Sequence, residues 1–143
     1  MDPELYPSWK FKIEILSGQH IQSADESSDI LDPYVKVRLR GHIDDEKDQD
    51  GAKINKGKTE HVKNNGFNPT WNATFYFESK VPDLAFLEFK VKDHSMSGTD
   101  KALGMFCCPL KSVQQGFRRV SLKSYSGKNL APATLLVKIT IEN

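Results

Sequence analysis

The sequence predicts an all-β protein built as an eight-stranded antiparallel β-sandwich. Apolar residues alternate with polar ones in short segments along most of the 143 residues, with the period of two that a half-buried strand requires. Clusters of Gly, Pro, Asn and Ser separate these segments, as turns do in antiparallel domains. Two sheets packed face to face are the natural way to bury the apolar side of every strand.

Eight segments carry the strand pattern, and in chain order they span residues 9–16, 34–40, 58–62, 71–78, 86–92, 103–110, 117–122 and 134–141. The alternation is clearest in the first, second and fourth, whose predicted inner faces consist of Phe11, Ile13 and Ile15, of Val35, Val37 and Leu39, and of Trp71, Ala73, Phe75 and Phe77. The third segment is short, and the last four complete the count. We expect one domain over residues 9–143, preceded by a tail of residues 1–8.

Composition argues against several classes of function. The chain carries 20 Lys and Arg against 19 Asp and Glu, a formal net charge of +1, so no global field favours nucleic acid. No apolar run approaches the roughly 20 residues that span a bilayer, and residues 1–9 lack the pattern of a signal peptide, so we expect a cytoplasmic protein. Cys107 and Cys108 are adjacent and would point to opposite faces of a strand, so we expect reduced, packed thiols.

The order of the strands predicts which connections meet. Successive antiparallel strands reverse the chain, so the first, third and fifth connections, residues 17–33, 63–70 and 93–102, gather at one pole. Oxygen-bearing side chains concentrate in these connections, at Asp25, Glu26, Asp29, Asp32, Asn64, Asn65, Asp93 and Asp100. Calcium takes six to eight oxygen ligands, so this pole is the candidate cation site. The alternative is that Asp and Asn beside prolines only initiate turns.

Independent catalysis finds little support in the sequence. No Ser lies in a Gly-x-Ser-x-Gly turn, no glycine-rich phosphate loop is present, and the four His show no pair at the spacing of a helical zinc site. The acidic stretch 46–51 resembles the start of an EF-hand loop, but Gly57 stands where that loop places its glutamate. We predict no catalytic residues in this chain.

Two motifs, DPYVK at 32–36 and NPTWN at 68–72, resemble those of a C2 domain. Further segments are similar to the C2 domain of delta-like phosphoinositide-specific phospholipases C: LSGQ at 16–19, NNGFNP at 64–69, VPDLA at 81–85, QGFR at 115–118 and APATL at 131–135. The resemblance covers nearly the whole chain. It implies the strand order of those enzymes, calcium-assisted docking on anionic membranes, and a parent phospholipase whose catalytic barrel is absent from these 143 residues.

The resemblance also implies a set of calcium ligands. The positions that match family ligands are Ile30, through its backbone carbonyl, Asp32, Asn64 and Asp93. Ser95 and Lys101 stand where the family usually has two further acids, while Asp29 and Asp100 are nearby substitutes. Losing two carboxylates lowers both the ligand count and the charge neutralisation. We therefore expect weak calcium binding, with a dissociation constant of roughly 0.1–1 mM, or binding only once lipid completes the shell.

A basic strand face is a second implied feature. Lys36, Arg38 and Lys58 match positions that contact phosphoinositide head groups in some relatives, and Arg40 adds a charge on the same side of its strand. Each cation near an anionic leaflet contributes about 1 kcal/mol. The alternative is an ordinary solvated face, because Lys and Arg also protect exposed strands from aggregation.

Three apolar residues, Ile30, Leu31 and Met96, are expected near the loop tips. There each side chain that enters the lipid interface would add roughly 1.5–3 kcal/mol. The alternative for Ile30 and Leu31 is that they fold back as a cap over the end of the sandwich.

Three functional hypotheses remain. The first is a peripheral membrane-docking module for anionic phospholipid, including phosphoinositides, with weak or lipid-assisted calcium binding. The second is a calcium-independent structural or protein-interaction domain, which Ser95 and Lys101 favour. The third, an enzyme, is the weakest. We expect a monomer whose partners are the membrane and, if the chain is a fragment of a larger lipase, the catalytic domain of that enzyme.

Overall fold

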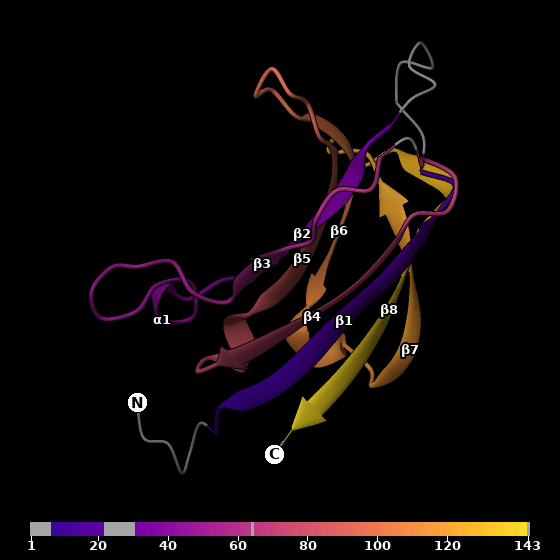
Figure 1. The fold of residues 1–143 in the computed structure, drawn as a ribbon. Coiled ribbons are helices and arrows are strands. Elements are labelled where there is room, and N and C mark those ends of the chain that lie inside the picture. The colour runs from indigo at the N-terminus through magenta and orange to yellow at the C-terminus, as the bar shows by residue number, and fades with distance from the viewer. Residues whose placement is uncertain (1–6, 22–30, 64, 143) are drawn as a thin grey trace.

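The computed structural model describes residues 7–21, 31–63 and 65–142, and most of their regular structure is β-strand (Figure 1). In chain order the elements are β1 (Trp9–Gln19), β2 (Pro33–Arg40), α1 (Ile43–Glu46), β3 (Lys56–Lys58), β4 (Thr70–Ser79), η1 (Pro82–Leu84), β5 (Phe86–Asp93), β6 (Lys101–Pro109), η2 (Leu110–Ser112), β7 (Gly116–Lys123) and β8 (Asn129–Glu142). The helix α1 and the 3-10 helices η1 and η2 are about one turn each.

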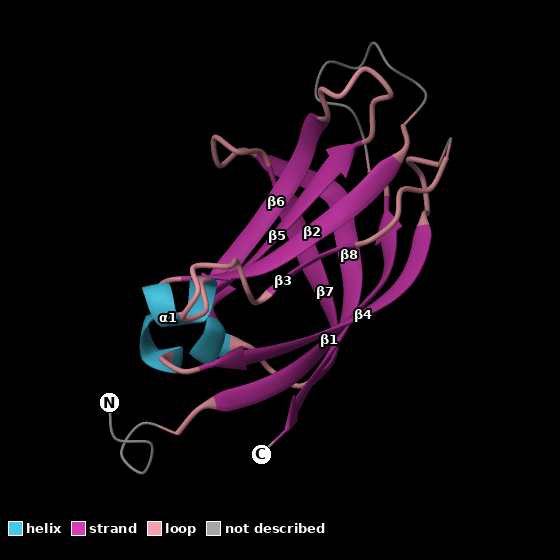
Figure 2. Cartoon of the chain, turned by 60° about the vertical axis from the view of Figure 1, so that its left-hand side comes forward, coloured by secondary structure: helices cyan, strands magenta, loops and turns pink. Residues whose placement is uncertain are grey.

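All eight strands belong to one antiparallel arrangement, with neighbours in the order β3-β2-β5-β6-β7-β8-β1-β4. β6 and β7 are in register at one position only, Met105 with Lys123. The arrangement folds over at this junction, so that β3, β2, β5 and β6 form one layer and β7, β8, β1 and β4 form the other (Figure 2). The predicted eight-stranded antiparallel sandwich is confirmed.

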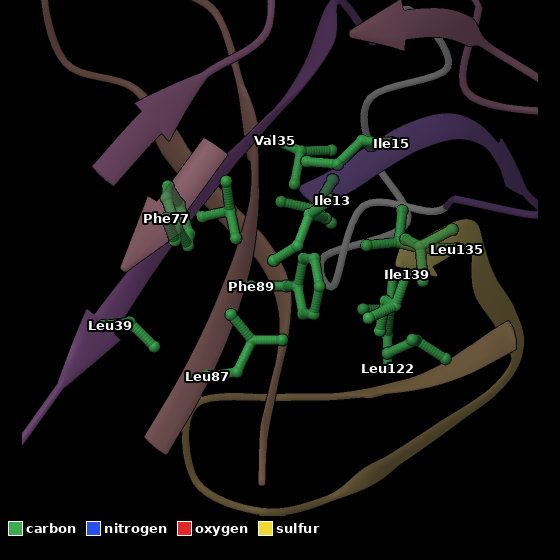
Figure 3. Close-up of a cluster of buried hydrophobic side chains, with 14 of the residues drawn as sticks. Ile13, Ile15, Val35, Leu39, Phe77, Leu87, Phe89, Leu122, Leu135 and Ile139 are labelled. Carbon is green, nitrogen blue, oxygen red and sulfur yellow. The ribbon is translucent and has the colours of Figure 1, made fainter. Parts of the chain in front are cut away.

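The core lies between the two layers and consists of alternate residues of their strands. Side chains no more than 5% exposed come from both layers and include Ile13, Ile15, Val35, Leu39, Leu87, Phe89, Leu122, Leu135 and Ile139 (Figure 3). Phe77 of β4 meets Phe11 of β1 edge to face, with ring centroids 5.6 Å apart. Because burying each such side chain contributes roughly 1.5–3 kcal/mol, this packing is the main stabilising term.

The third strand is shorter than predicted and begins earlier. It spans Lys56–Lys58 instead of 58–62. The two layers come close together here, since a Cβ added to Gly57 would lie 2.2 Å from the Phe75 ring of β4. Residues 59–62 continue along β2 as extended chain, because the Thr59 N–H donates to the Val35 carbonyl at 2.9 Å.

Two expectations about packing hold only in part. Trp71, Ala73 and Phe75 point inward from β4 but are half-buried, because β4 is the outer strand of its layer and the three-residue β3 covers little of it. Both cysteines are free thiols. Cys108 packs against the core, whereas Cys107 points to the opposite face of β6 and is exposed, so the expected packing of Cys107 is wrong.

The long β2–β3 connection is fixed to the end of β4 by one buried carboxylate. Asp45 of α1 is 0% exposed and accepts hydrogen bonds from the Ser79 hydroxyl at 2.6 Å and from the backbone N–H groups of Lys80 at 2.6 Å and Val81 at 3.3 Å. Asn55 reinforces the contact, since its amide donates to the Asp45 carbonyl at 2.9 Å. Because β2 and β4 belong to different layers, these bonds hold the layers together at the end of the sandwich opposite the candidate cation site, the lower pole in Figure 1.

Replacing this carboxylate leaves three backbone or hydroxyl donors, two of them in buried hydrogen bonds, without their acceptor. We expect Asp45→Ala to lower the free energy of unfolding by about 3 kcal/mol, measured by urea denaturation followed through tryptophan fluorescence. The matched control is Asp44→Ala, whose side chain is 60% exposed and which we expect to change stability by less than about 0.5 kcal/mol. Equal unfolding midpoints for the two variants would contradict the conclusion that Asp45 holds the β2–β3 connection to the end of β4.

Candidate functional site

The pole of the candidate cation site, the upper pole in Figure 1, brings together two of the predicted calcium ligands. The Asp32 N–H donates to Asp93 Oδ1 at 2.8 Å, and the His94 N–H donates to the Asp32 carbonyl at 2.9 Å. The Asn65 N–H donates to the Leu31 carbonyl at 3.0 Å, which ties the connection before β4 to the same place. The described parts of the first, third and fifth connections therefore meet as predicted, and the β5–β6 connection projects beyond the sheets at the top of Figure 1.

Asp100 is already engaged by donors of the protein. One carboxylate oxygen accepts from the Tyr34 hydroxyl in a short hydrogen bond, and the other accepts from the Ser95 N–H at 2.9 Å. The Tyr34 hydrogen bond, followed by that of Ser95, lowers the pKa of Asp100. Burial, followed by the hydrogen bond to Asp100, raises the pKa of Tyr34 well above its usual range. Asp100 thus holds the β5–β6 connection against the start of β2.

An aromatic cluster joins the pole to the outer face of β2. The imidazoles of His61 and His94 are stacked, with ring centroids 4.0 Å apart and an interplanar angle of 13°. Tyr34 meets His94 edge to face at 6.4 Å, and Lys58 Nζ lies over the Tyr34 ring at 5.4 Å. Tyr34 therefore contacts Asp100 of the acidic pole on one side and Lys58 of β3 on the other.

The described residues alone do not make a calcium site. Of the predicted ligands, Ile30, Asp29 and Asn64 lie outside the described residues. Within the described part of the chain, no three His, Cys, Asp or Glu side chains gather in a way that could hold a metal ion. Asp32 and Asp93 remain as neighbours, and one Asp93 oxygen already accepts a backbone N–H. Two carboxylates fall well short of the six to eight oxygens that calcium takes.

The two described apolar residues expected at the loop tips differ in their surroundings. Met96 is 99% exposed at the turn of the β5–β6 connection, as expected. Leu31 is 3% exposed and belongs to the core, so its placement at an exposed tip is wrong and the alternative of a cap is correct for this residue. The reason is local, because Leu31 lies against Gly66, where an added Cβ would come within 2.9 Å of it.

The outer face of β3, β2 and β5 carries more cations than the sequence pattern alone had indicated. A groove of about 370 Å³ is lined by Lys36, Val37, Arg38, Lys53, Lys56, Gly57 and Lys58. Lys36 is in register with Lys58 on one side and with Lys90 on the other. Lys90 and Lys92 were missed although they alternate with buried residues of β5, the same signal that identified Lys36 and Arg38. Lys53 lies in the β2–β3 connection, where no periodicity points to it.

Mutual repulsion and a neighbouring acid shape the charge of this basic groove. Burial is the largest cause that lowers the pKa of Lys36, and the neighbouring charges of Lys92 and Lys58 lower it further. Glu88 neutralises part of the face, since its carboxylate lies 3.1 Å from Arg38 Nε and 3.7 Å from Lys90 Nζ.

Arg40 does not line the basic groove. It lies at the far end of β2, where its Nε is 3.4 Å from the Glu46 carboxylate. Its predicted grouping with Lys36 and Arg38 is therefore correct for the side of the strand but not for the groove.

In the described ranges, no helix is long and apolar enough to cross a bilayer.

Comparison with known proteins agrees with this geometry. The family model for the C2 domain matches residues 9–133. The mouse protein 1-phosphatidylinositol 4,5-bisphosphate phosphodiesterase delta-3 is 36% identical over 146 residues, which cover 99% of this chain and 18% of the relative. The human delta-1 protein of the same name is 36% identical over 141 residues, covering 96% of this chain and 18% of the relative. The chain thus spans less than a fifth of the length of these curated relatives.

Solved structures show the same fold. The crystal structure of PLC21 from L. pealei superposes with a TM-score of 0.76 at 26% identity, covering 94% of this chain and 16% of that one. A C2 domain of plant Extended Synaptotagmin 1 superposes with a TM-score of 0.72 at 24% identity, covering 94% of both chains.

Removing the Tyr34 hydroxyl tests the contact that holds the β5–β6 connection. In Tyr34→Phe we expect the pKa of Asp100 to rise toward the ordinary aspartate value of about 3.9, measured by carbon NMR titration of the carboxyl. Because the native pKa is lowered, the contact stabilises the fold above about pH 4 and this contribution is lost as the pH falls through the native pKa. Tyr76→Phe, on the other layer, should leave the Asp100 titration unchanged. An unchanged titration in Tyr34→Phe would refute the contact.

Proposed function

This chain belongs to the C2 domain family, and from that premise we propose that it is a peripheral docking module for anionic phospholipid membranes. Its target includes the phosphorylated head groups of phosphoinositides, and it acts at the cytoplasmic face of a membrane. It carries no catalytic activity of its own and is a part or relative of a phosphoinositide phospholipase C. The names of its relatives support this last point, since they are phosphodiesterases of a phosphoinositide and several times longer than this chain.

The basic groove is the observation that carries the proposal. Five of its seven lining residues are Lys or Arg, drawn from β2, β3 and the connection between them. Burial, and after it the neighbouring charges of Lys92 and Lys58, lower the pKa of Lys36, and an anionic head group would offset the repulsion among these cations. Each cation contributes about 1 kcal/mol near an anionic leaflet, so the groove as a whole contributes several times that amount.

The upper pole would lie at the membrane together with the groove. Lys58 contacts Tyr34, which in turn holds the β5–β6 connection through Asp100, so groove and loop are parts of one surface. Met96 at the turn of that connection is almost fully exposed and would enter the lipid interface. A single methionine contributes roughly 1.5–3 kcal/mol when buried, which assists the groove without replacing it.

Calcium has a secondary role in this proposal. Asp32 and Asp93 are the two predicted ligands that lie together in the described part of the pole, and Asp100 is engaged by Tyr34 and Ser95. We expect weak calcium binding that lipid oxygens complete. The competing hypothesis is a calcium-independent structural or protein-interaction domain, which the engagement of Asp100 favours.

Neutralising the groove should weaken membrane binding strongly. We expect the combined variant Lys36→Gln, Arg38→Gln and Lys58→Gln to bind vesicles that contain phosphatidylserine and phosphoinositide about 100-fold more weakly, since three cations at about 1 kcal/mol each are lost. Co-sedimentation at fixed ionic strength measures the partition. The matched control is Lys10→Gln, Lys80→Gln and Lys128→Gln, which removes the same charge from exposed positions elsewhere. Equal loss in both variants would point to net charge and away from the groove.

Comparing vesicle binding in calcium with binding in chelator tests whether calcium at the upper pole assists docking. We expect wild-type binding to vesicles to rise when about 1 mM calcium replaces chelator, and Asp93→Asn to lose that increase while retaining the chelator-resistant part. Asparagine keeps an oxygen that accepts the Asp32 N–H, so the loop should hold its shape. Asp83→Asn, at the opposite pole, serves as the control. Wild-type binding that is the same in calcium and in chelator would leave docking to the basic groove alone, and no binding in either buffer would establish the structural or protein-interaction hypothesis.

A further inference from the structure

The junction between β6 and β7 leaves two strand edges open toward each other. Beyond the pair of Met105 with Lys123, β6 continues to Pro109 in register with β5 alone, and β7 runs from Gly116 to Val120 in register with β8 alone. In the described chain, neither stretch has a strand partner on its second side. A strand edge without a partner presents a row of N–H and C=O groups that another extended segment can pair with.

A small apolar groove lies between these two edges. Its volume is about 220 Å³, and its apolar lining comes from both layers: Leu87, Phe89, Phe106, Val113, Val120 and Ile139. The consecutive residues Arg118, Arg119 and Val120 all line it, so the groove runs along the backbone edge of β7. This volume is below the roughly 300–1,000 Å³ of sites for drug-sized ligands. It suits one aliphatic side chain of a strand, whose alternate side chains point to one side.

The charge at the groove is positive. Arg118 and Arg119 line it, and none of its lining residues is acidic. The Arg118 guanidinium is fixed by bonds from Nε and Nη2 to the carbonyl of Gln115, at 3.2 and 2.7 Å. A guanidinium has five N–H donors, so the remaining ones can bind a carboxylate. Arg119 is exposed, and within the described ranges its side chain has no hydrogen bond or ion pair.

We propose that the groove between β6 and β7 binds an extended acidic peptide segment of a protein partner, which adds a strand to the open edge of β7. Backbone hydrogen bonds to β7 supply affinity, and one aliphatic side chain of the peptide fills the groove. The neighbouring acidic side chains pair with Arg118 and Arg119. This site is separate from the basic groove on β2 and β3 and does not depend on membrane binding.

Selection from a display library of random linear decapeptides against the whole 143-residue chain tests the proposal. We expect selected peptides in which aliphatic residues alternate with Asp or Glu. Arg119→Glu should weaken their binding at least tenfold by fluorescence anisotropy, whereas the matched charge reversal Lys128→Glu should change it less than twofold. Peptide binding should also slow amide hydrogen exchange along Phe117–Arg119.

Two results would overturn the proposal. Failure to select any peptide would mean that the β7 edge does not accept a strand. Arg118, on the same side of β7 as the buried Val120, would then be a charged residue that prevents strand addition. Selected peptides that bind Arg119→Glu as well as wild type would mean that they bind elsewhere. Vesicle co-sedimentation of Arg119→Glu should match wild type, so a failure of this proposal is distinguishable from a failure of the lipid-docking proposal.

Discussion

The packing of two inner strand faces against each other is the constraint from which the other features of this protein follow. Because strands alternate sides at every residue, burying Val35 and Val37 of β2 forces Lys36 and Arg38 outward. The same alternation in β5 buries Phe89 and Val91 and so places Lys90 and Lys92 outside. Adjacent strands in fixed register then set these cations beside one another. The basic groove is thus a consequence of how the core is made.

Polar contacts fix the two ends of the sandwich, beyond the apolar core. At the lower pole Asp45 gathers donors from the end of β4, and at the upper pole Asp100 joins the β5–β6 connection to Tyr34 of β2. Each contact joins segments more than 30 residues apart in the chain. The upper contact has a functional consequence, because it occupies a carboxylate that the sequence predicted as a substitute calcium ligand. The pole is therefore better built to hold a loop in place than to hold a cation with its described residues.

Much of the fold could be predicted from the sequence, because period-two alternation reports directly which side of a strand is buried. The same signal predicted the outward direction of Lys36, Arg38 and Arg40, and it would also have found Lys90 and Lys92. It could not predict that Arg40 pairs with Glu46 or that Leu31 is buried against Gly66, because those contacts depend on how connections pack. The burial of Asp45 was equally hidden, since in sequence it belongs to an acidic run that resembles a solvated loop.

The most direct test of the central claim is to find which face meets a membrane. Amide relaxation by NMR, with a gadolinium-chelating lipid in anionic bilayer nanodiscs, reports the distance of each residue from the lipid surface. We expect the strongest relaxation at Lys36, Lys58 and Met96, around the basic groove and the β5–β6 connection. Strongest relaxation along the outer face of β7 and β8, with Lys36 and Lys58 unaffected, would contradict a docking surface on β2 and β3.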